Sequence, residues 1–216
     1  MTIFISIGPT CNVKYQINKY KGKKETLFFD WLLTDMESVN SIFSCHDIDD
    51  ILFVDNMMID DTDISKISIK SLSHCVSLHD VGVNIYDMYN IENEAKGHQK
   101  VFYFDKAREH FIEKYKRRYQ KIIDYVQSDK HLVFVRYGSI DNKNKNMFIQ
   151  SIKRLNPNCC FTLVSVNINQ GINCIRKEEH FLEINLVDEK GSRDSSDWMT
   201  SLLNWEQIFK DIDEYM

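Results

Sequence analysis

Residues 131–169 read "HLVFVRYGSIDNKNKNMFIQSIKRLNPNCCFTLVSVNIN", and this stretch decides the fold. "HLVFVRYG" is a short run rich in Val and Phe that ends in Gly138, which is typical of a buried strand. "NKNMFIQSIKRLN" predicts a helix that stops before Pro157, and "CCFTLVSVNI" predicts a second buried strand. A strand, a helix and a strand in this order indicate a βαβ unit.

The segments around this unit extend the same alternation. Residues 106–128 carry apolar side chains at helical spacing and predict a long amphipathic helix. Residues 180–188 are compatible with a further strand, and residues 196–216 with a closing amphipathic helix. Residues 87–105, rich in Tyr and Asn, predict a loop insertion.

The N-terminal third predicts smaller elements. Residues 2–7 form a strand ended by Gly-Pro, and Thr10 is placed to cap the helix that follows. Short helical pieces are expected over residues 35–58, and a strand or hairpin over residues 67–80. We therefore expect a single domain over residues 1–216, of α/β (or α+β) class, with a mixed central sheet flanked by helices.

The composition excludes several classes of protein. Of 216 residues, 43% are hydrophobic and 27% charged, which is ordinary for a globular protein. A net charge of -5 gives no electrostatic reason to expect nucleic acid as a partner. No stretch approaches the roughly 18 apolar residues of a membrane span, and the N-terminus lacks a signal-peptide pattern. We expect a cytoplasmic protein, with no membrane contact, whose six cysteines stay reduced.

The sequence also contains no motif for a metal or a cofactor. No cysteine pair has the spacing of a zinc site, and no phosphate-binding or dinucleotide-binding motif occurs. We therefore expect neither a metal nor a cofactor.

The amino-acid composition has one strong bias. Ala95 and Ala107 are the only alanines, whereas Ile, Lys, Asn and Asp abound. This bias indicates an AT-rich coding sequence, as in some bacteria and many large DNA viruses.

The first candidate for chemistry is Cys11, in "SIGPTCNVKYQINKY" (residues 6–20). A thiolate is favoured in the first turn of a helix, where backbone N–H groups and the helix dipole converge. The same N–H groups can stabilise the oxyanion of an acyl-transfer intermediate. The alternative is a buried structural cysteine, since free cysteine is among the most buried residue types.

A nucleophilic cysteine needs a base, and His79 is the best-placed histidine in the sequence. It closes an apolar alternation and is followed directly by Asp80, a carboxylate that can fix the imidazole tautomer. His74 is the nearest competitor.

Buried charges supply the remaining candidates. Asp30 lies inside the apolar run "LFFDWLL" and must be paired or hydrogen-bonded there. The alternatives are a helix cap, a pairing with an arginine, or a carboxylate that orients a catalytic histidine. Arg117, Arg118 and Arg136 are the arginines considered as its partners. Arg118 and Arg136 are alternatively an anion-binding set for a substrate phosphate or carboxylate, whereas Arg117 is expected on the surface.

These motifs occur in an order that resembles a known family. "SIGPTC", "FFDW", "LHD", "EKYKRRYQKII" and "LVFVRYG" follow one another along the chain. The set is similar to the family described as "putative papain-like cysteine peptidases", whose members share S-x-G-x-x-C, P-F-D-W, H-D, K-Y-x-R-R and F-V-R motifs. The resemblance covers about residues 3–210. Phe28 stands where the family has its proline.

The resemblance implies a cysteine hydrolase, peptidase or deubiquitinase-like, with a papain-like nucleophile helix that starts at Cys11. Its substrate would be a protein or peptide. His79 would be the general base, and Asp80 or Asp30 the carboxylate that orients it. No glutamine precedes Cys11, so Asn12 or backbone N–H groups would form the oxyanion hole.

Two other functions are compatible with the same residues. One is a catalytically inactive binding or host-interaction protein on an inherited enzyme fold. The other is a transferase that binds a phosphorylated donor through Arg136 and Arg118.

Overall fold

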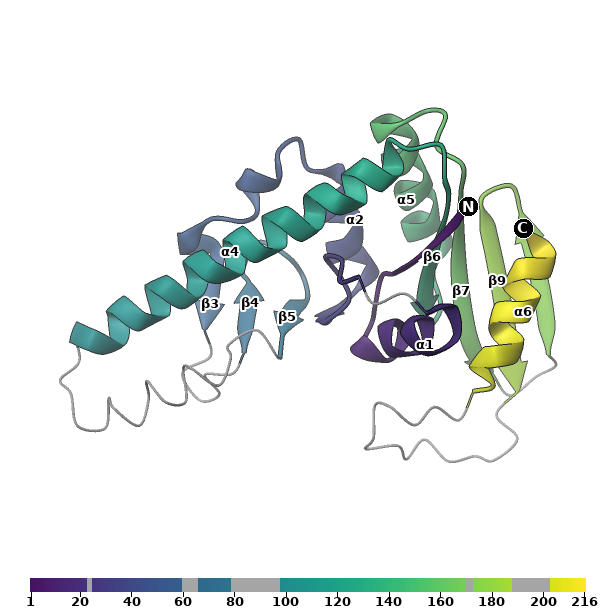
Figure 1. Ribbon diagram of the computed structural model, residues 1–216, viewed down its shortest axis with the longest axis horizontal. Coiled ribbons are helices and arrows are strands. Elements are labelled where there is room, and N and C mark those ends of the chain that lie inside the picture. The colour runs from purple at the N-terminus through teal and green to yellow at the C-terminus, as the bar shows by residue number, and fades with distance from the viewer. Residues whose placement is uncertain (23–24, 60–65, 79–97, 170–172, 188–202) are drawn as a thin grey trace.

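The computed structural model describes residues 1–22, 25–59, 66–78, 98–169, 173–187 and 203–216. Its centre is a five-stranded sheet in the order β1-β6-β7-β9-β8 (Figure 1). Neighbouring strands from β1 to β9 pair in parallel, and β8 pairs antiparallel with β9. The strands are β1 (Thr2–Ser6), β6 (His131–Tyr137), β7 (Phe161–Asn169), β8 (Cys174–Glu178) and β9 (Phe181–Val187).

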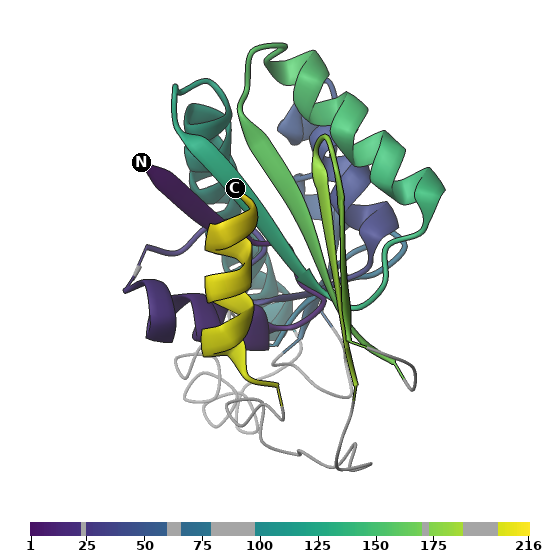
Figure 2. The same ribbon diagram turned by 90° about the vertical axis from the view of Figure 1, so that its right-hand side faces the viewer.

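Helices cover both faces of this sheet (Figure 2). Helices α1 (Cys11–Lys21) and α6 (Trp205–Tyr215) pack on one face, where their apolar side chains join those of Val133 and Val164. Helices α2 (Met36–Ser44), α4 (His98–Val126) and α5 (Asn142–Leu155) contribute to the core on the other face, around Phe134 and Leu163. The fold is therefore α/β, as predicted, and β6, α5 and β7 form the expected βαβ unit.

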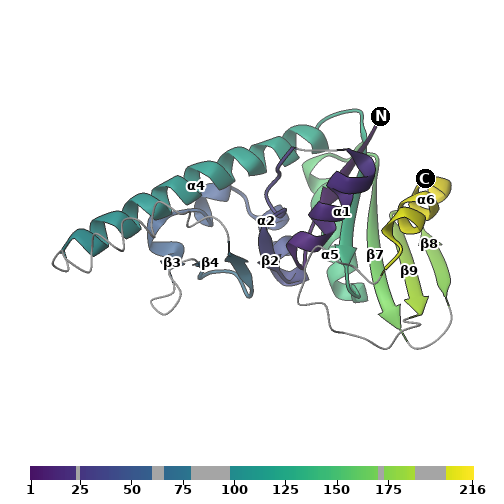
Figure 3. The same ribbon diagram turned by 60° about the horizontal axis from the view of Figure 1, so that its bottom comes forward.

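A second sheet has the order β2-β5-β4-β3, with every pairing antiparallel. Helix α4 runs past it and reaches α5 beside the first sheet (Figures 1 and 3). The second sheet comprises β2 (Leu32–Thr34), β3 (Met57–Ile59), β4 (Ile67–Ile69) and β5 (Cys75–Ser77). Two short 3-10 helices, η1 (Ile48–Asp50) and η2 (Val54–Asn56), lie between α2 and β3. Strands β4 and β5 form the hairpin expected over residues 67–80.

Side-chain caps explain where three of these helices begin. Thr10, Asp35 and Asp141 each accept a hydrogen bond from a backbone N–H in the first turn of α1, α2 and α5. Such a cap satisfies an amide that has no partner within its own helix. Helix α1 ends at Gly22, which has φ +66°.

Some element boundaries differ from the predictions. Helix α4 begins at His98, so it includes residues 98–105 of the segment predicted as a loop. Helix α6 has Trp205 as its first residue, and residues 196–202 of the predicted closing helix lie outside the described residues. Strand β8 was not predicted. Within the part of the chain that the structure describes, no helix is long and apolar enough to cross a membrane.

Candidate active site

Cys11 is the first residue of α1, directly after the capping residue Thr10. Thr10 Oγ1 accepts a hydrogen bond from the backbone N–H of Asn12 at 3.4 Å. The Cys11 side chain is half-buried, and this burial raises the pKa of its thiol, against the opposing effect of its own backbone N–H. A thiol with a raised pKa is mostly protonated at neutral pH, so Cys11 needs a base to act as a nucleophile.

The turn before Cys11 is held at three consecutive carbonyl groups. The carbonyl oxygen of Ile7 accepts from Arg136 Nη1 at 2.8 Å. Next along the chain, Gly8 O accepts from the backbone N–H of Tyr137 at 3.2 Å, and Pro9 O accepts from that of Thr34 at 3.1 Å. Cys11 is therefore presented by a turn anchored to both sheets, because Tyr137 belongs to β6 and Thr34 to β2.

Gly8 is required by this arrangement for two reasons. Its φ is +84°, a conformation that residues with a Cβ rarely adopt. A Cβ there would also collide with Thr34 Oγ1 and lie 3.3 Å from Arg136 Nη1.

We expect Gly8→Ala to destabilise the protein by about 2 kcal/mol, because it combines backbone strain with a displaced Thr34. Gly22→Ala is the matched control: its φ is +66°, but nothing lies within 4 Å of the added Cβ. Chemical denaturation should show a clearly larger loss for Gly8→Ala. Equal losses would mean that the contact with Thr34 does not matter.

Asp30 is fully buried and forms a salt bridge with Lys14 of α1 at 3.0 Å. Its Oδ2 also accepts a hydrogen bond from the backbone N–H of Leu27 at 2.7 Å. Burial raises the pKa of Asp30 to about 6, although Lys14, Leu27 and the charge of Arg118 favour the ionised form. The salt-bridge partner of Asp30 is thus Lys14, on the helix that begins at Cys11, and not one of the three arginines named in the sequence analysis.

Each of the three arginines has a distinct place. Arg136 is 7% exposed and uses both terminal nitrogens on backbone carbonyls, Nη1 on Ile7 and Nη2 on Thr34 at 3.0 Å. Arg118 is 9% exposed, with its guanidinium 4.8 Å from the ring centre of Tyr115. Arg117 is exposed, as predicted. The anion-binding role of Arg118 and Arg136 stays a prediction.

The predicted base and its neighbour, His79 and Asp80, lie outside the described residues. Strand β5 ends at Ser77, which pairs with Leu32 of β2. The competitor His74 is exposed, and its backbone N–H donates to Ser38 Oγ at 2.9 Å while its carbonyl accepts from Asp35. His74 is therefore held at the start of α2.

Of the other five cysteines, Cys45 and Cys174 are half-buried, as Cys11 is, and burial also raises the pKa of the Cys45 thiol. Cys75 and Cys159 are buried, with thiol pKa values raised by burial to about 12 and about 11 respectively. Cys160 is exposed, and all six cysteines are free thiols. Among the described residues, no group of three or more His, Cys, Asp or Glu side chains could hold a metal ion.

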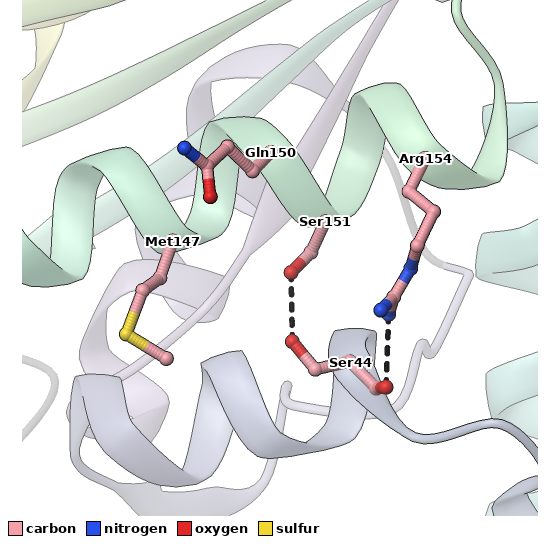
Figure 4. A pocket seen from close by; sticks show the side chains of 5 residues that line it. All are labelled: Ser44, Met147, Gln150, Ser151 and Arg154. Carbon is pink, nitrogen blue, oxygen red and sulfur yellow. Dashed lines mark hydrogen bonds between the residues drawn. The ribbon is translucent and has the colours of Figure 1, made fainter.

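A cavity of about 240 Å³ lies between α2 and α5 (Figure 4). Ser44 Oγ and Ser151 Oγ are 2.7 Å apart across it, and Arg154 Nη2 donates to Ser44 O at 2.8 Å. Met147 and Gln150 complete its lining. Because α2 and α5 pack on the face of the sheet opposite α1, this cavity is separate from Cys11.

Sequence reasoning missed two residues of this site. Lys14 lies beside the apolar positions Val13 and Ile17 of α1, but a lysine near an apolar stripe is no signal for a buried ion pair. Thr34 acts mainly through its backbone N–H and C=O groups, which side-chain patterns do not reveal.

Comparisons with known proteins agree with the motif order. The mimivirus protein "Uncharacterized protein R408" (Acanthamoeba polyphaga mimivirus) is 25% identical over 229 residues, covering 96% of each chain. No solved structure matches the protein. The sequence model of one family matches residues 2–171, which include Cys11, Asp30, His79 and Arg136. The chain therefore belongs to the family described as "Putative papain-like cysteine peptidase (DUF1796)".

Proposed function

We propose that the protein is a cysteine hydrolase that cleaves an amide or ester bond in a protein or peptide substrate. Cys11 is the nucleophile and His79 the general base. The observation that carries the proposal is the position of Cys11 at the start of α1, on a turn whose three preceding carbonyls are all hydrogen-bonded. Such anchoring fixes a nucleophile beside the N–H groups of the first helical turn, which can stabilise an oxyanion.

Chain length supports His79 as the base. His79 is two residues beyond Ser77, so their Cα atoms are at most about 7 Å apart. Ser77 pairs with Leu32, and Leu32 follows Asp30 by two residues. Asp30 in turn contacts Lys14, one turn along α1 from Cys11. The base and the nucleophile therefore belong to segments that meet near Asp30.

Asp30 is favoured over Asp80 as the orienting carboxylate. Its Oδ1 atom is buried and accepts no hydrogen bond from the residues that the structure describes. A buried carboxylate oxygen without a donor is costly, and an imidazole N–H from His79 would satisfy it. Asp80 stays the alternative.

The reaction follows from these roles. His79 removes the thiol proton, Cys11 Sγ attacks the carbonyl carbon, and the N–H groups of the first turn of α1 stabilise the oxyanion. The His79 imidazolium then protonates the leaving group, which departs and leaves an acyl-enzyme that water hydrolyses. The transferase alternative is weaker, because both terminal nitrogens of Arg136 already bind backbone carbonyls.

Competitive labelling of the six cysteines tests this proposal. A limiting amount of iodoacetamide at pH 7, followed by peptide mass spectrometry, should modify Cys11 first, and Cys11→Ser should remove that fast reaction. The exposed Cys160 is the internal reference, because accessibility alone favours it. If Cys160 reacts first and Cys11 remains unmodified, the protein is an inactive member of the fold, and the hydrolase proposal fails.

A further inference from the structure

We infer that Arg136 is a positioning residue: its forked hydrogen bonds hold the Cys11 turn in register with the β2–β5 pair that leads to His79. This inference rests on the proposed nucleophile and base. It concerns Arg136, which the sequence analysis considered as a partner of Asp30 or as part of an anion-binding set, and it gives this residue a different role.

The contacts of Arg136 join three segments of the chain. The side chain starts from β6, and its Nη1 donates to Ile7 O at the end of β1 at 2.8 Å. Its Nη2 donates to Thr34 O at the end of β2 at 3.0 Å. A planar guanidinium sets these two carbonyls at a fixed spacing, which a lysine ammonium cannot do. Arg136 is thus a rigid spacer between the sheets.

Thr34 connects Arg136 both to the turn before Cys11 and to strand β5. Its backbone N–H donates to Pro9 O at 3.1 Å, two residues before Cys11. Thr34 also pairs with Cys75 of β5, the strand that ends two residues before His79. A shift of Thr34 would therefore move the nucleophile's turn relative to the segment that carries the base.

The Arg136 side chain is enclosed closely enough to favour these two hydrogen bonds over other conformations. The Arg136 side chain is 7% exposed, and Gly8 brings its backbone close to both Arg136 Nη1 and Thr34 Oγ1. Burial lowers the pKa of Arg136 to about 10, which leaves it protonated at neutral pH. Loss of the two hydrogen bonds from Arg136 would leave the buried carbonyls of Ile7 and Thr34 without these donors. Because an unsatisfied buried carbonyl is costly, the turn would shift to a position where other donors reach it.

The test is the pH dependence of Cys11 alkylation by iodoacetamide, followed by mass spectrometry on the full chain. Arg136→Lys keeps the charge but loses the fork. We expect it to slow alkylation of Cys11 at pH 7 by roughly 10- to 100-fold, the cost of a displaced reacting group, and to move the pH midpoint upwards. Gly8→Ala disturbs the same turn without changing Arg136 itself, and should shift the midpoint in the same direction.

Arg154→Lys is the matched control, because Arg154 also donates to backbone carbonyls, those of Phe43 and Ser44. It should leave the Cys11 profile unchanged. If Arg136→Lys and Gly8→Ala lower the melting temperature but keep the wild-type profile, Arg136 is merely structural and the inference is wrong. The proposed function fails by a different result, a wild-type profile that does not respond to His79→Ala.

Discussion

Replacing His79 by alanine is expected to slow the reaction of Cys11 with iodoacetamide at pH 7 by at least about 30-fold. A cysteine without a base is only a few per cent thiolate at this pH, and burial raises the pKa of the Cys11 thiol further. In the proposed mechanism, the thiolate of wild-type Cys11 forms by proton transfer to His79. The loss in hydrolysis of a substrate would be larger, about 10²- to 10⁴-fold, because the base also acts in the transition state.

His74→Ala is the control for this result. His74 directly precedes β5, the strand that leads to His79. The structure places His74 at the start of α2, near Asp35 and Ser38. Its loss should leave the alkylation rate near the wild-type value. A large effect of His74→Ala together with a small effect of His79→Ala would reverse the assignment of the base. Rates from single-residue mass spectrometry separate these cases.

Replacing Lys14 by methionine is expected to destabilise the fold by about 3–5 kcal/mol, the usual cost of leaving one member of a buried ion pair alone. Lys14 and Asp30 have side chains 4% and 1% exposed, 3.0 Å apart. Without Lys14 the buried Asp30 carboxylate would keep the hydrogen bond from the Leu27 backbone N–H but lose its salt-bridge partner. Urea denaturation measures the loss.

Two further variants show whether the effect comes from the buried charge. Lys14→Met combined with Asp30→Asn should recover part of the lost free energy, because no unpaired charge remains. Lys121→Met is the matched control: Lys121 pairs with Glu25 at 2.9 Å, but both side chains are substantially exposed. It should cost less than about 1 kcal/mol. Equal costs for Lys14→Met and Lys121→Met would contradict the buried-pair account.

The pair also makes a prediction about pH. The pKa of Asp30 is about 6 in the folded state, against an ordinary value of 3.8. The folded state therefore binds this proton more tightly than the unfolded state. The resulting stabilisation is fully present below pH 3.8 and is lost as the pH rises through 6. The difference in unfolding free energy between the wild type and Asp30→Asn should follow this curve.

Most of the central sheet could be predicted from the sequence, because these strands are short and apolar, and β1 and β6 are each followed closely by a glycine. "HLVFVRYG" and "CCFTLVSVNI" are buried on both faces, so they lack the alternation of a half-exposed strand. The start of α1 could also be predicted, because threonine is a preferred capping residue and Thr10 follows the Gly8-Pro9 turn. Strand β8 could not be predicted from its pattern, because its residues are mostly polar and exposed, as an edge strand allows.

The candidate site was predictable only in part. The position of Cys11 at a helix start could be predicted, because the turn and the capping residue before it are local properties of the sequence. The pairing of Asp30 with Lys14 and the fork of Arg136 could not be predicted, because they join residues far apart in the chain. For Arg136 the sequence left open a pairing with Asp30 or a role in anion binding, and it gave no sign that both terminal nitrogens bind carbonyls from two other segments.

The most direct test of the account is the distance between Cys11 Sγ and the nearest imidazole nitrogen, measured by crystallography on the wild-type protein. We predict that a nitrogen of His79 lies within about 4 Å of the sulfur, as a nucleophile and its base require, and that the sulfur is open to solvent. A separation well beyond this distance, with another side chain filling the space between them, would contradict the account.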